Sequence, residues 1–526
     1  MKRGDIFSRR TLLKAAVALA AGTNLNCPVN NQFIGYGSDS FTLPEIIDLN
    51  QSEAEVLDYF RQVFEIGLES LRFGDIHAHT NYSFLSELCG LTDQTPIYGP
   101  DLALQHAKDC GLDFIALTEN AEMQNIAAIT NIAKNLSDQR VIAKLREYHA
   151  EKLNPVEILE RLECDFREKS IGSVLGLSTW RNEIEWNNYH NSRGIIAFNA
   201  FEYTNTVNLP IIGSREAFGH RIALFRDIEQ DRVPWNPIGA SWIASQIFQA
   251  EYAHTGRDLH NMLSSYEGRV ITIPHAVAKI GDTDTLNQSG GPQDHRLDLN
   301  YLNKRFDRGV EIFSKWGNFM GPAPRGYPGA GQEELFFYTR GIADPITIRS
   351  FLHQGWCVNG DLNFALSFFG GTDGHTGDPA SPVYPSCMMY CPGSVTGVVA
   401  KHLTRGEVFD GMFDGHTIVT TTSASNKRIP MLMAVRTKRN DHINDHIMGD
   451  QGVHDGHVVL NVVADRDVTQ LELVVDGGVA GTFAGNHLRA DISLPQGNHF
   501  VYARAVSFDS EKKYTWTSPV YLRSSN

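Results

Sequence analysis

Cysteine is scarce in this chain of 526 residues, which contains only seven. None of them forms a Cys-x-x-Cys pair, and Cys387 and Cys391, four apart, have no second cysteine or histidine pair nearby. A structural zinc site of the tetrahedral cysteine type needs such a second pair. The spacing therefore disfavours structural zinc, favours a disulfide or two free thiols for this pair, and gives no support for a catalytic cysteine.

An excess of positive charge is also absent. The chain carries 46 Lys and Arg residues against 61 Asp and Glu residues, which gives a formal net charge of -15. Proteins that bind nucleic acid normally present a basic face to its phosphates. The composition therefore argues for a large globular protein without a nucleic-acid partner.

No apolar run near the N-terminus is long enough for a stable membrane anchor, because residues 15–22 form only a short and weakly apolar stretch. The run SRRTLLK at residues 8–14 matches the twin-arginine export pattern, and ALA at 18–20 is a small-residue cleavage site. We predict a signal peptide over residues 1–30 and a periplasmic or secreted protein. The alternative is an ordinary surface helix, which would have to lie at the extreme N-terminus by accident.

Beyond this segment, helical and strand-like patterns alternate. Apolar residues at helical intervals predict helix over residues 44–70, and a short helix over 102–110 is stopped by Gly111. The apolar run at 112–117 then predicts a buried parallel strand. Helix, glycine and apolar strand in this order are typical of an α/β fold. Residues 121–190 are long, polar and helical, which indicates an insertion.

Polar residues that can bind metal follow the short apolar runs along the chain. Further runs lie at 194–201, 221–225, 270–273, 310–313 and 364–369. In a parallel barrel, functional groups gather where the strands end, whatever their separation in sequence. The candidate metal ligands are His77, His79, Glu119, Glu202, His220, His275, Asp373 and His375. Each alone could be a buried polar residue with a structural partner, but burying so many polar groups without a shared role is costly.

The types of these ligands indicate the class of metal. Imidazole and carboxylate without thiolate suit Zn, Mn or Fe and do not distinguish among the three. The candidates exceed the needs of one ion, so a multinuclear site is predicted, in which Glu202 or Asp373 could bridge. Such a site activates water at neutral pH and clamps the oxygens of a tetrahedral ester. The predicted reaction class is therefore hydrolysis with metal-activated hydroxide.

Five short motifs occur in order along the chain: FGDIHAHT at 73–80, GLDFIALT at 111–118, GHR at 219–221, IPH at 273–275 and GTDGH at 371–375. Together they resemble the PHP superfamily and, more closely, its DUF3604 branch. Glu202, followed by an aromatic residue and Thr, and YTWTSP at 514–519 fit the same branch. The resemblance implies a distorted (β/α)7 TIM-like barrel over residues 44–430 with the helical insertion, a multinuclear metal site, and hydrolysis of phosphate esters.

Two positions depart from the family pattern. Thr118-Glu119-Asn120 stands where the family has Thr-Asp-His, so an imidazole is replaced by an amide, which is a poor ligand for transition metals. Leu85 occupies the place of a common acidic residue, although Glu87 lies close by. We therefore expect one or two divalent ions, with Glu119 either a ligand or an acceptor of a hydrogen bond from a ligating histidine.

Catalytic roles can be assigned as hypotheses. His220 or His375, where not occupied by metal, could protonate the leaving group. Arg221 or Lys315 could stabilise the charge that develops on the ester oxygens. The structural alternative is that these long cations pair with carboxylates of the barrel. The loop 317–332 could line the substrate entrance or be only an ordered connection.

The chain changes character after about residue 430. Strand-like runs at 458–464, 471–475 and 500–506 are separated by turns and lack intervening helices. They predict a small C-terminal β-sandwich-like domain over residues 431–526. We expect this domain to pack on the barrel. The alternative is that it binds carbohydrate or a surface, since sandwich folds have many unrelated functions.

Three functions remain open at this stage. The first is an exported hydrolase of small phosphate esters. The second is a sulfuric-ester hydrolase in the same site, because sulfate and phosphate esters share tetrahedral geometry. The third is a metal-binding or ligand-binding protein without catalysis, which the departures at Leu85 and Asn120 suggest. The natural ester and the oligomeric state are not determined by these patterns.

Overall fold

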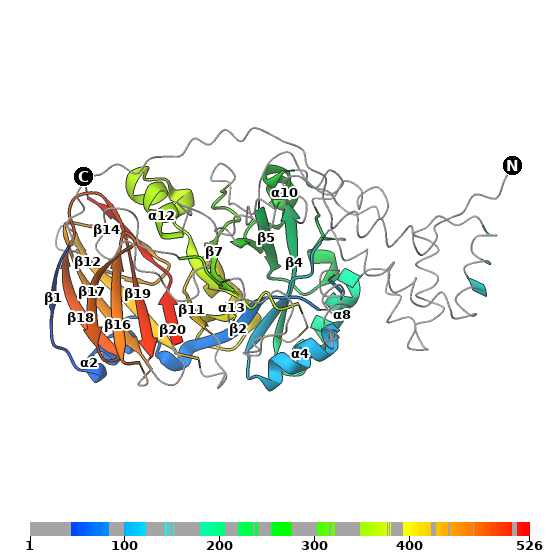
Figure 1. Cartoon of the computed structure of the whole chain (residues 1–526), viewed down its shortest axis with the longest axis horizontal. Coiled ribbons are helices and arrows are strands. Elements are labelled where there is room, and N and C mark those ends of the chain that lie inside the picture. Colours follow the sequence, from blue (N-terminus) through cyan, green and yellow to red (C-terminus); the bar gives the residue numbers. More distant parts are fainter. Residues whose placement is uncertain are drawn as a thin grey trace, which may run out of the picture.

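A computed structural model gives the arrangement of the chain (Figure 1). The residues that it describes are 44–80, 82–83, 99–121, 143–144, 147, 151, 179–205, 219–234, 237–239, 253, 255–275, 302–314, 317–320, 348–375, 377, 379, 393–421, 428–439, 442–465, 468–507 and 513–525. The predictions for residues 1–30, for most of the insertion at 121–190, and for Leu85, Lys315 and Cys387 lie outside these residues. No helix in the described part of the chain is both long and apolar enough to cross a membrane.

The described chain begins with a strand, not with a helix. β1 (Glu45–Asp48) pairs antiparallel with β18 (His487–Ser493), so the prediction of continuous helix over residues 44–70 is wrong at its start. A run of four residues is too short for its periodicity to separate strand from helix. Helix α2 (Glu53–Val63) follows, where Ser52 and Glu55 form a reciprocal capping box, and the 3-10 helix η1 (Leu68–Ser70) leads into the next strand.

The strands that carry the predicted ligands lie side by side. β2 (Leu71–Ala78), β3 (Phe114–Leu117) and β4 (Ile196–Asn205) are parallel neighbours. β5 (Gly219–Phe225) runs antiparallel to β4 and also to β6 (Val270–His275). The predicted strands are thus present, but one of them is reversed.

A second small sheet closes this series of strands. β7 (Gly309–Ser314) is parallel to β9 (Ser367–Gly370) and also pairs with the short β8 (Gly317–Asn318). Isolated parallel bridges join Thr272 of β6 to Asp307 just before β7, and Ala78 of β2 to Gly374 just after β9. The order β2, β3, β4, β5, β6, β7, β9 therefore returns to β2. We call this arrangement the strand ring.

In the part of the chain that the structure describes, helices are few compared with strands. α4 (Pro100–Asp109) begins at its proline and ends before Gly111, whose φ is +68°, which confirms the helix and the stop predicted there. The other helical elements are α8 (Thr179–Asn191), η3 (Gln230–Arg232), α10 (Gly256–Met262), η4 (Leu263–Tyr266), α12 (Ile348–Leu352), η6 (His353–Val358), η7 (Leu362–Phe364) and α13 (Arg405–Asp414). The fold is mixed α/β with large sheets, and the expected regular alternation of a (β/α)7 barrel is not confirmed.

Strands dominate the C-terminal part, as predicted. They are β10 (Ser394–Val399), β11 (Thr417–Thr421), β12 (Met431–Arg439), β13 (His442–Ile447), β14 (Gln451–His454), β15 (His457–Ala464), β16 (Gln470–Val475), β17 (Gly478–Ala484), β18, β19 (Asn498–Ser507), β20 (Lys513–Thr517) and β21 (Val520–Ser524). One 5-stranded sheet has the order β1-β18-β15-β12-β13, and a 13-stranded sheet runs from β14 through β20, β11 and β10 to β2 and on to β6. The hydrogen-bonded sheet therefore continues across residue 430.

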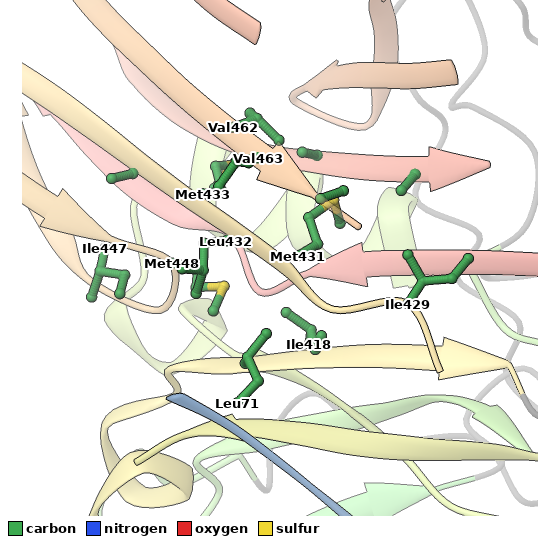
Figure 2. Packing of buried hydrophobic residues seen from close by; sticks show 14 of the residues in the cluster. Leu71, Ile418, Ile429, Met431, Leu432, Met433, Ile447, Met448, Val462 and Val463 are labelled. Carbon is green, nitrogen blue, oxygen red and sulfur yellow. The ribbon is translucent and has the colours of Figure 1, made fainter. Parts of the chain in front are cut away.

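One hydrophobic core joins these two sheets to the strand ring. It contains Leu460 of the 5-stranded sheet, Ala503 of the 13-stranded sheet and Phe60 of α2, all essentially inaccessible to solvent. Figure 2 shows Leu71 of β2 and Ile418 of β11 close to Met431 and Leu432 at the start of β12. Because β2 leads directly to His77, the packing of the C-terminal strands fixes the strand that carries the first ligands.

Candidate metal centre

His77 and His79 lie at the end of β2 with no exposed surface. The Nε2 atoms of their rings are 3.2 Å apart, as expected for residues that share one face of a strand. Asp75 lies below them and accepts hydrogen bonds from the backbone N–H groups of His77 and Thr372, at 3.1 and 3.0 Å. The strand end is thereby tied to the segment after β9.

That segment brings Asp373 against the two histidines. Gly371 permits the approach, because a Cβ at this position would lie 2.4 Å from the Cβ of His77. Asp373 itself has a left-handed backbone, φ +51°, which is a strained conformation often found at functional sites. Its Oδ1 lies 3.2 Å from Nε2 of His79 and 3.6 Å from Nε2 of His77.

The reversed direction of β5 places His220 at the same rim. His220 stands near the start of its strand, whereas Glu202 lies in the last part of β4 and His275 is the last residue of β6. In the antiparallel register His220 faces Thr204 on one side and His275 on the other. Sequence order alone would put the start of a strand at the opposite edge, so only the reversal explains why His220 joins the others.

Glu202 is the centre of this second group. Its Oε1 lies 2.5 Å from Nδ1 of His220 and 2.6 Å from Nε2 of His275, and its Oε2 lies 3.6 Å from Nε2 of His79. Burial alone would raise the pKa of Glu202, but the neighbouring His220 and His275 hold it well below its ordinary value. Glu202 is therefore a charged carboxylate with both oxygens engaged.

Two sets of buried donors have the geometry of a metal site. The ligand atoms of His77, His79 and Asp373 lie within 4.8 Å of one another, and so do those of His77, Glu202 and His275. All of these side chains are buried, and together they supply imidazole nitrogen and carboxylate oxygen, the donors that Zn, Mn and Fe accept. The residues present thus fit divalent metal, and His77 is common to both sets.

His375 lies at the edge of this cluster. Its ring packs on that of His79 with the centroids 4.3 Å apart, and its Nδ1 is 2.9 Å from the backbone oxygen of Asp373. Because a carbonyl only accepts, Nδ1 of His375 carries the proton in this contact. His375 is 9% exposed, more than the histidines of β2. It is not part of either compact donor set.

Glu119 and Asn120 support the cluster from the end of β3. Oε1 of Glu119 accepts from the backbone N–H of Thr80 at 2.8 Å and from the Thr80 hydroxyl at 2.5 Å. Burial raises the pKa of Glu119 to about 7. Glu119 therefore accepts from Thr80 and not from a histidine, and it belongs to neither donor set.

Asn120 stands where the sequence resemblance led us to expect an imidazole, and it makes different contacts. Its amide nitrogen donates a short hydrogen bond to Oε2 of Glu202, and its Oδ1 accepts from the Ser83 hydroxyl at 2.5 Å. An isolated bridge also links the backbones of Asn120 and Glu202. Asn120 thus holds the central carboxylate in place, a role for which an amide is well suited.

Arg221 is turned away from the cluster, in contrast to the hypothesis that it contacts the ester. Its neighbours on the same face of β5, Ala223 and Phe225, belong to a separate hydrophobic core from Ile222 and Leu224, which share the face of His220. The Arg221 guanidinium is fully buried and donates to Oδ1 of Asp307 at 3.1 Å. The structural alternative, pairing with a buried carboxylate, therefore describes Arg221, whose partner Asp307 lies just before β7 of the strand ring.

Two buried carboxylates near these strands escaped the sequence analysis. Glu311 of β7 lies inside a run that reads as apolar, and its Oε2 is 2.7 Å from Nδ1 of His77. Glu183 of α8 is fully buried, and neither of its oxygens has a hydrogen-bond partner among the described residues. Burial raises the pKa of Glu183 well above its ordinary value, and the charge of Glu119 adds to this. A carboxylate inside an apolar strand is a signal that marks Glu311, whereas the polar sequence of α8 gives no such signal for Glu183.

Comparisons with known proteins give only distant similarity. No family model and no curated protein matches the chain. A two-domain protein of Bacteroides vulgatus ATCC 8482, described as containing a predicted PHP-like metal-dependent phosphoesterase, is 12% identical, with 86% of this chain and 96% of that chain covered and a TM-score of 0.36. Fibronectin(III)-like modules of Clostridium thermocellum CbhA are 18% identical over 15% of this chain and 91% of theirs, with a TM-score of 0.13. At these values neither similarity determines the fold or the activity, which rest on the geometry described above.

Proposed function

We propose that this chain is a metal-dependent hydrolase of small phosphate esters, of the PHP type and close to the DUF3604 branch, with the strand ring as a distorted barrel. The observation that supports this most is the convergence of His77, His79 and Asp373 with Glu202 and His275, from strands far apart in sequence. The motifs that resemble the family lie at this rim. Neither donor set contains a thiolate, which fits a catalytic centre better than a structural zinc site of the cysteine type.

The donors suit one or two ions. His77, His79 and Asp373 would hold one ion. Glu202 and His275, together with His77, would hold a second ion or contribute to binding the first. Divalent Zn, Mn or Fe bound there would supply an activated water and positive charge opposite the ester oxygens. Glu202 is a member of the second set, and its Oε2, which accepts from Asn120, also lies 3.6 Å from Nε2 of His79 in the first set.

His375 is the residue that we assign to protonation of the leaving group. The contact of its Nδ1 with the Asp373 carbonyl fixes the orientation of the ring, so a second proton would be carried at Nε2. His220 is a weaker candidate for this role because its Nδ1 already contacts Glu202. Arg221 has no part in this scheme, since it is paired with Asp307.

The purified protein should contain divalent metal and hydrolyse nitrophenyl phosphate or bis-nitrophenyl phosphate. Chelation should abolish turnover, and addition of Zn, Mn or Fe should restore it, because the ion supplies the activated water and the positive charge opposite the ester oxygens. Metal content is measured by elemental analysis beside the rates. If the protein prefers nitrophenyl sulfate, the substrate class would be sulfuric esters instead of phosphate esters. Absence of both metal and turnover would contradict the proposal.

Export by the twin-arginine pathway is part of the same proposal and rests on the run SRRTLLK at residues 8–14. Twin-arginine export carries folded proteins, so the metal can be inserted before the enzyme leaves the cytoplasm. Replacing Arg9 and Arg10 together with lysine should leave the full-length chain in the cytoplasm, while the native chain appears in the periplasm in shortened form. Fractionation and mass measurement of the N-terminus test this, and an unshortened native chain in the cytoplasm would refute it.

A further inference from the structure

Glu311 lies behind two of the candidate metal ligands. Its Oε2 is 2.7 Å from Nδ1 of His77, and its Oε1 is 3.7 Å from Nδ1 of His275. The other ring nitrogens, Nε2 of His77 and Nε2 of His275, face the donor cluster, at 3.2 Å from His79 and 2.6 Å from Glu202. A single carboxylate thus lies next to Nδ1 of both rings, on the side away from the donor cluster.

The strand ring explains how one side chain reaches both histidines. β7 lies beside β6, which ends in His275, and next to β9, which is joined to β2 and His77. On β7, Val310 and Ile312 pack into an apolar core, so Glu311 points to the opposite face. The rings of His77 and His275 meet nearly perpendicular with centroids 4.4 Å apart, and Nδ1 of each ring is the nitrogen that lies toward Glu311.

Nδ1 of His275 and Oε1 of Glu311 are complementary as hydrogen-bond donor and acceptor. Among the described residues, Nδ1 of His275 and Oε1 of Glu311 have no hydrogen-bond partner, and they face each other at 3.7 Å. A closer approach of less than about 1 Å would give a normal hydrogen bond. Glu311 is fully buried, and an unpaired carboxylate there would be costly. The two histidines are the partners that the described structure offers it.

We propose that Glu311 is the shared positioning residue of the metal centre, which accepts from Nδ1 of both His77 and His275 and thereby directs Nε2 of both toward the metal. This inference rests on the proposed function. A carboxylate behind a ligating histidine fixes its tautomer and ring orientation, and loss of such a partner typically lowers metal affinity about 10- to 100-fold. Here one carboxylate would orient ligands from two strands, β2 and β6.

Glu311→Gln is the sharpest test, because the glutamine keeps the shape and retains only one acceptor oxygen for two donors. Zn titration of the chelator-treated full chain should show about 10- to 100-fold weaker binding, with the same number of ions at saturation. Glu183→Gln is the matched control, since Glu183 is equally buried but contacts no histidine among the described residues. Its affinity for Zn should stay within about 2-fold of the native value.

The outcomes separate this inference from the proposed function. Native protein that binds none of Zn, Mn and Fe would refute both. Native binding with unchanged affinity in Glu311→Gln would refute only the role of Glu311, and loss of one ion at saturation would make Glu311 a direct ligand instead. If Glu311→Gln fails to fold, long-range ¹H–¹⁵N spectra of the native Zn form decide. Protonated Nδ1 in both His77 and His275 is expected, and protonated Nε2 in either would refute the inference.

Discussion

Glu202→Gln is expected to lose metal and to lower kcat/KM by roughly 1,000-fold, since an ion at such a site contributes several kcal/mol to the transition state. Glu202 uses Oε1 for His220 and His275 and Oε2 for the amide nitrogen of Asn120. A glutamine has one acceptor oxygen, so its NH₂ group must face either the histidines or another NH₂ group. It also removes the negative charge that Glu202 supplies to the donor set of His77, Glu202 and His275.

The measurement is metal per chain together with the rate on nitrophenyl phosphate. Glu472→Gln is a suitable control, because Glu472 is a partly buried carboxylate that pairs with Arg504 on the C-terminal strands. It should keep both metal and rate. Full metal content and full activity in Glu202→Gln would show that the centre lies elsewhere.

Arg221→Met is expected to lower the free energy of unfolding by about 3 to 5 kcal/mol, the usual effect of removing one partner of a buried ion pair. The substitution leaves Asp307 buried in the protein interior. Arg221 and His260 hold the pKa of Asp307 below its ordinary value against the effect of burial, and the Thr272 hydroxyl donates to the same carboxylate at 2.7 Å. Denaturant unfolding of the metal-free chain measures the loss.

Arg226→Ala is the control for this loss of stability, because it removes an exposed ion pair instead of a buried one. Arg226 follows β5 directly and pairs with Asp410, but the two side chains are 39% and 50% exposed. Pairs of this kind contribute about 0 to 1 kcal/mol. An Arg221→Met chain with native stability and reduced turnover would reverse our assignment and return Arg221 to the reaction.

The sequence predicts the rim of the site better than its interior. His77, His79 and Asp373 stand just after or at the end of apolar runs, where polar residues are conspicuous, and the structure brings them together. Glu311 was missed because it lies within residues 310–313, where one charge among apolar neighbours does not disturb the pattern of a strand. Its role depends on what lies across the ring, which no local pattern contains.

The direction of a strand is equally invisible in a short run. The apolar residues of β5 have the same alternation whether the strand is parallel or antiparallel to its neighbours. His220 could therefore be recognised as a candidate, but its place at the rim could not be derived from the rule that ligands follow their strands. Likewise, residues 45–48 pair with β18, far along the chain, and this long-range partner decides that they are a strand.

Because β5 is reversed, some contacts of the centre join residues close in sequence, whereas others join residues far apart. Glu202 and His220 are separated by only 18 residues, and Glu202 and His275 by 73. The contact between Thr372 and His77, by contrast, closes a loop of 295 residues. Closing a longer loop costs more conformational entropy, and distant contacts slow folding. One half of the centre is thus encoded locally by consecutive strands, whereas the other half exists only once the ends of the ring have met.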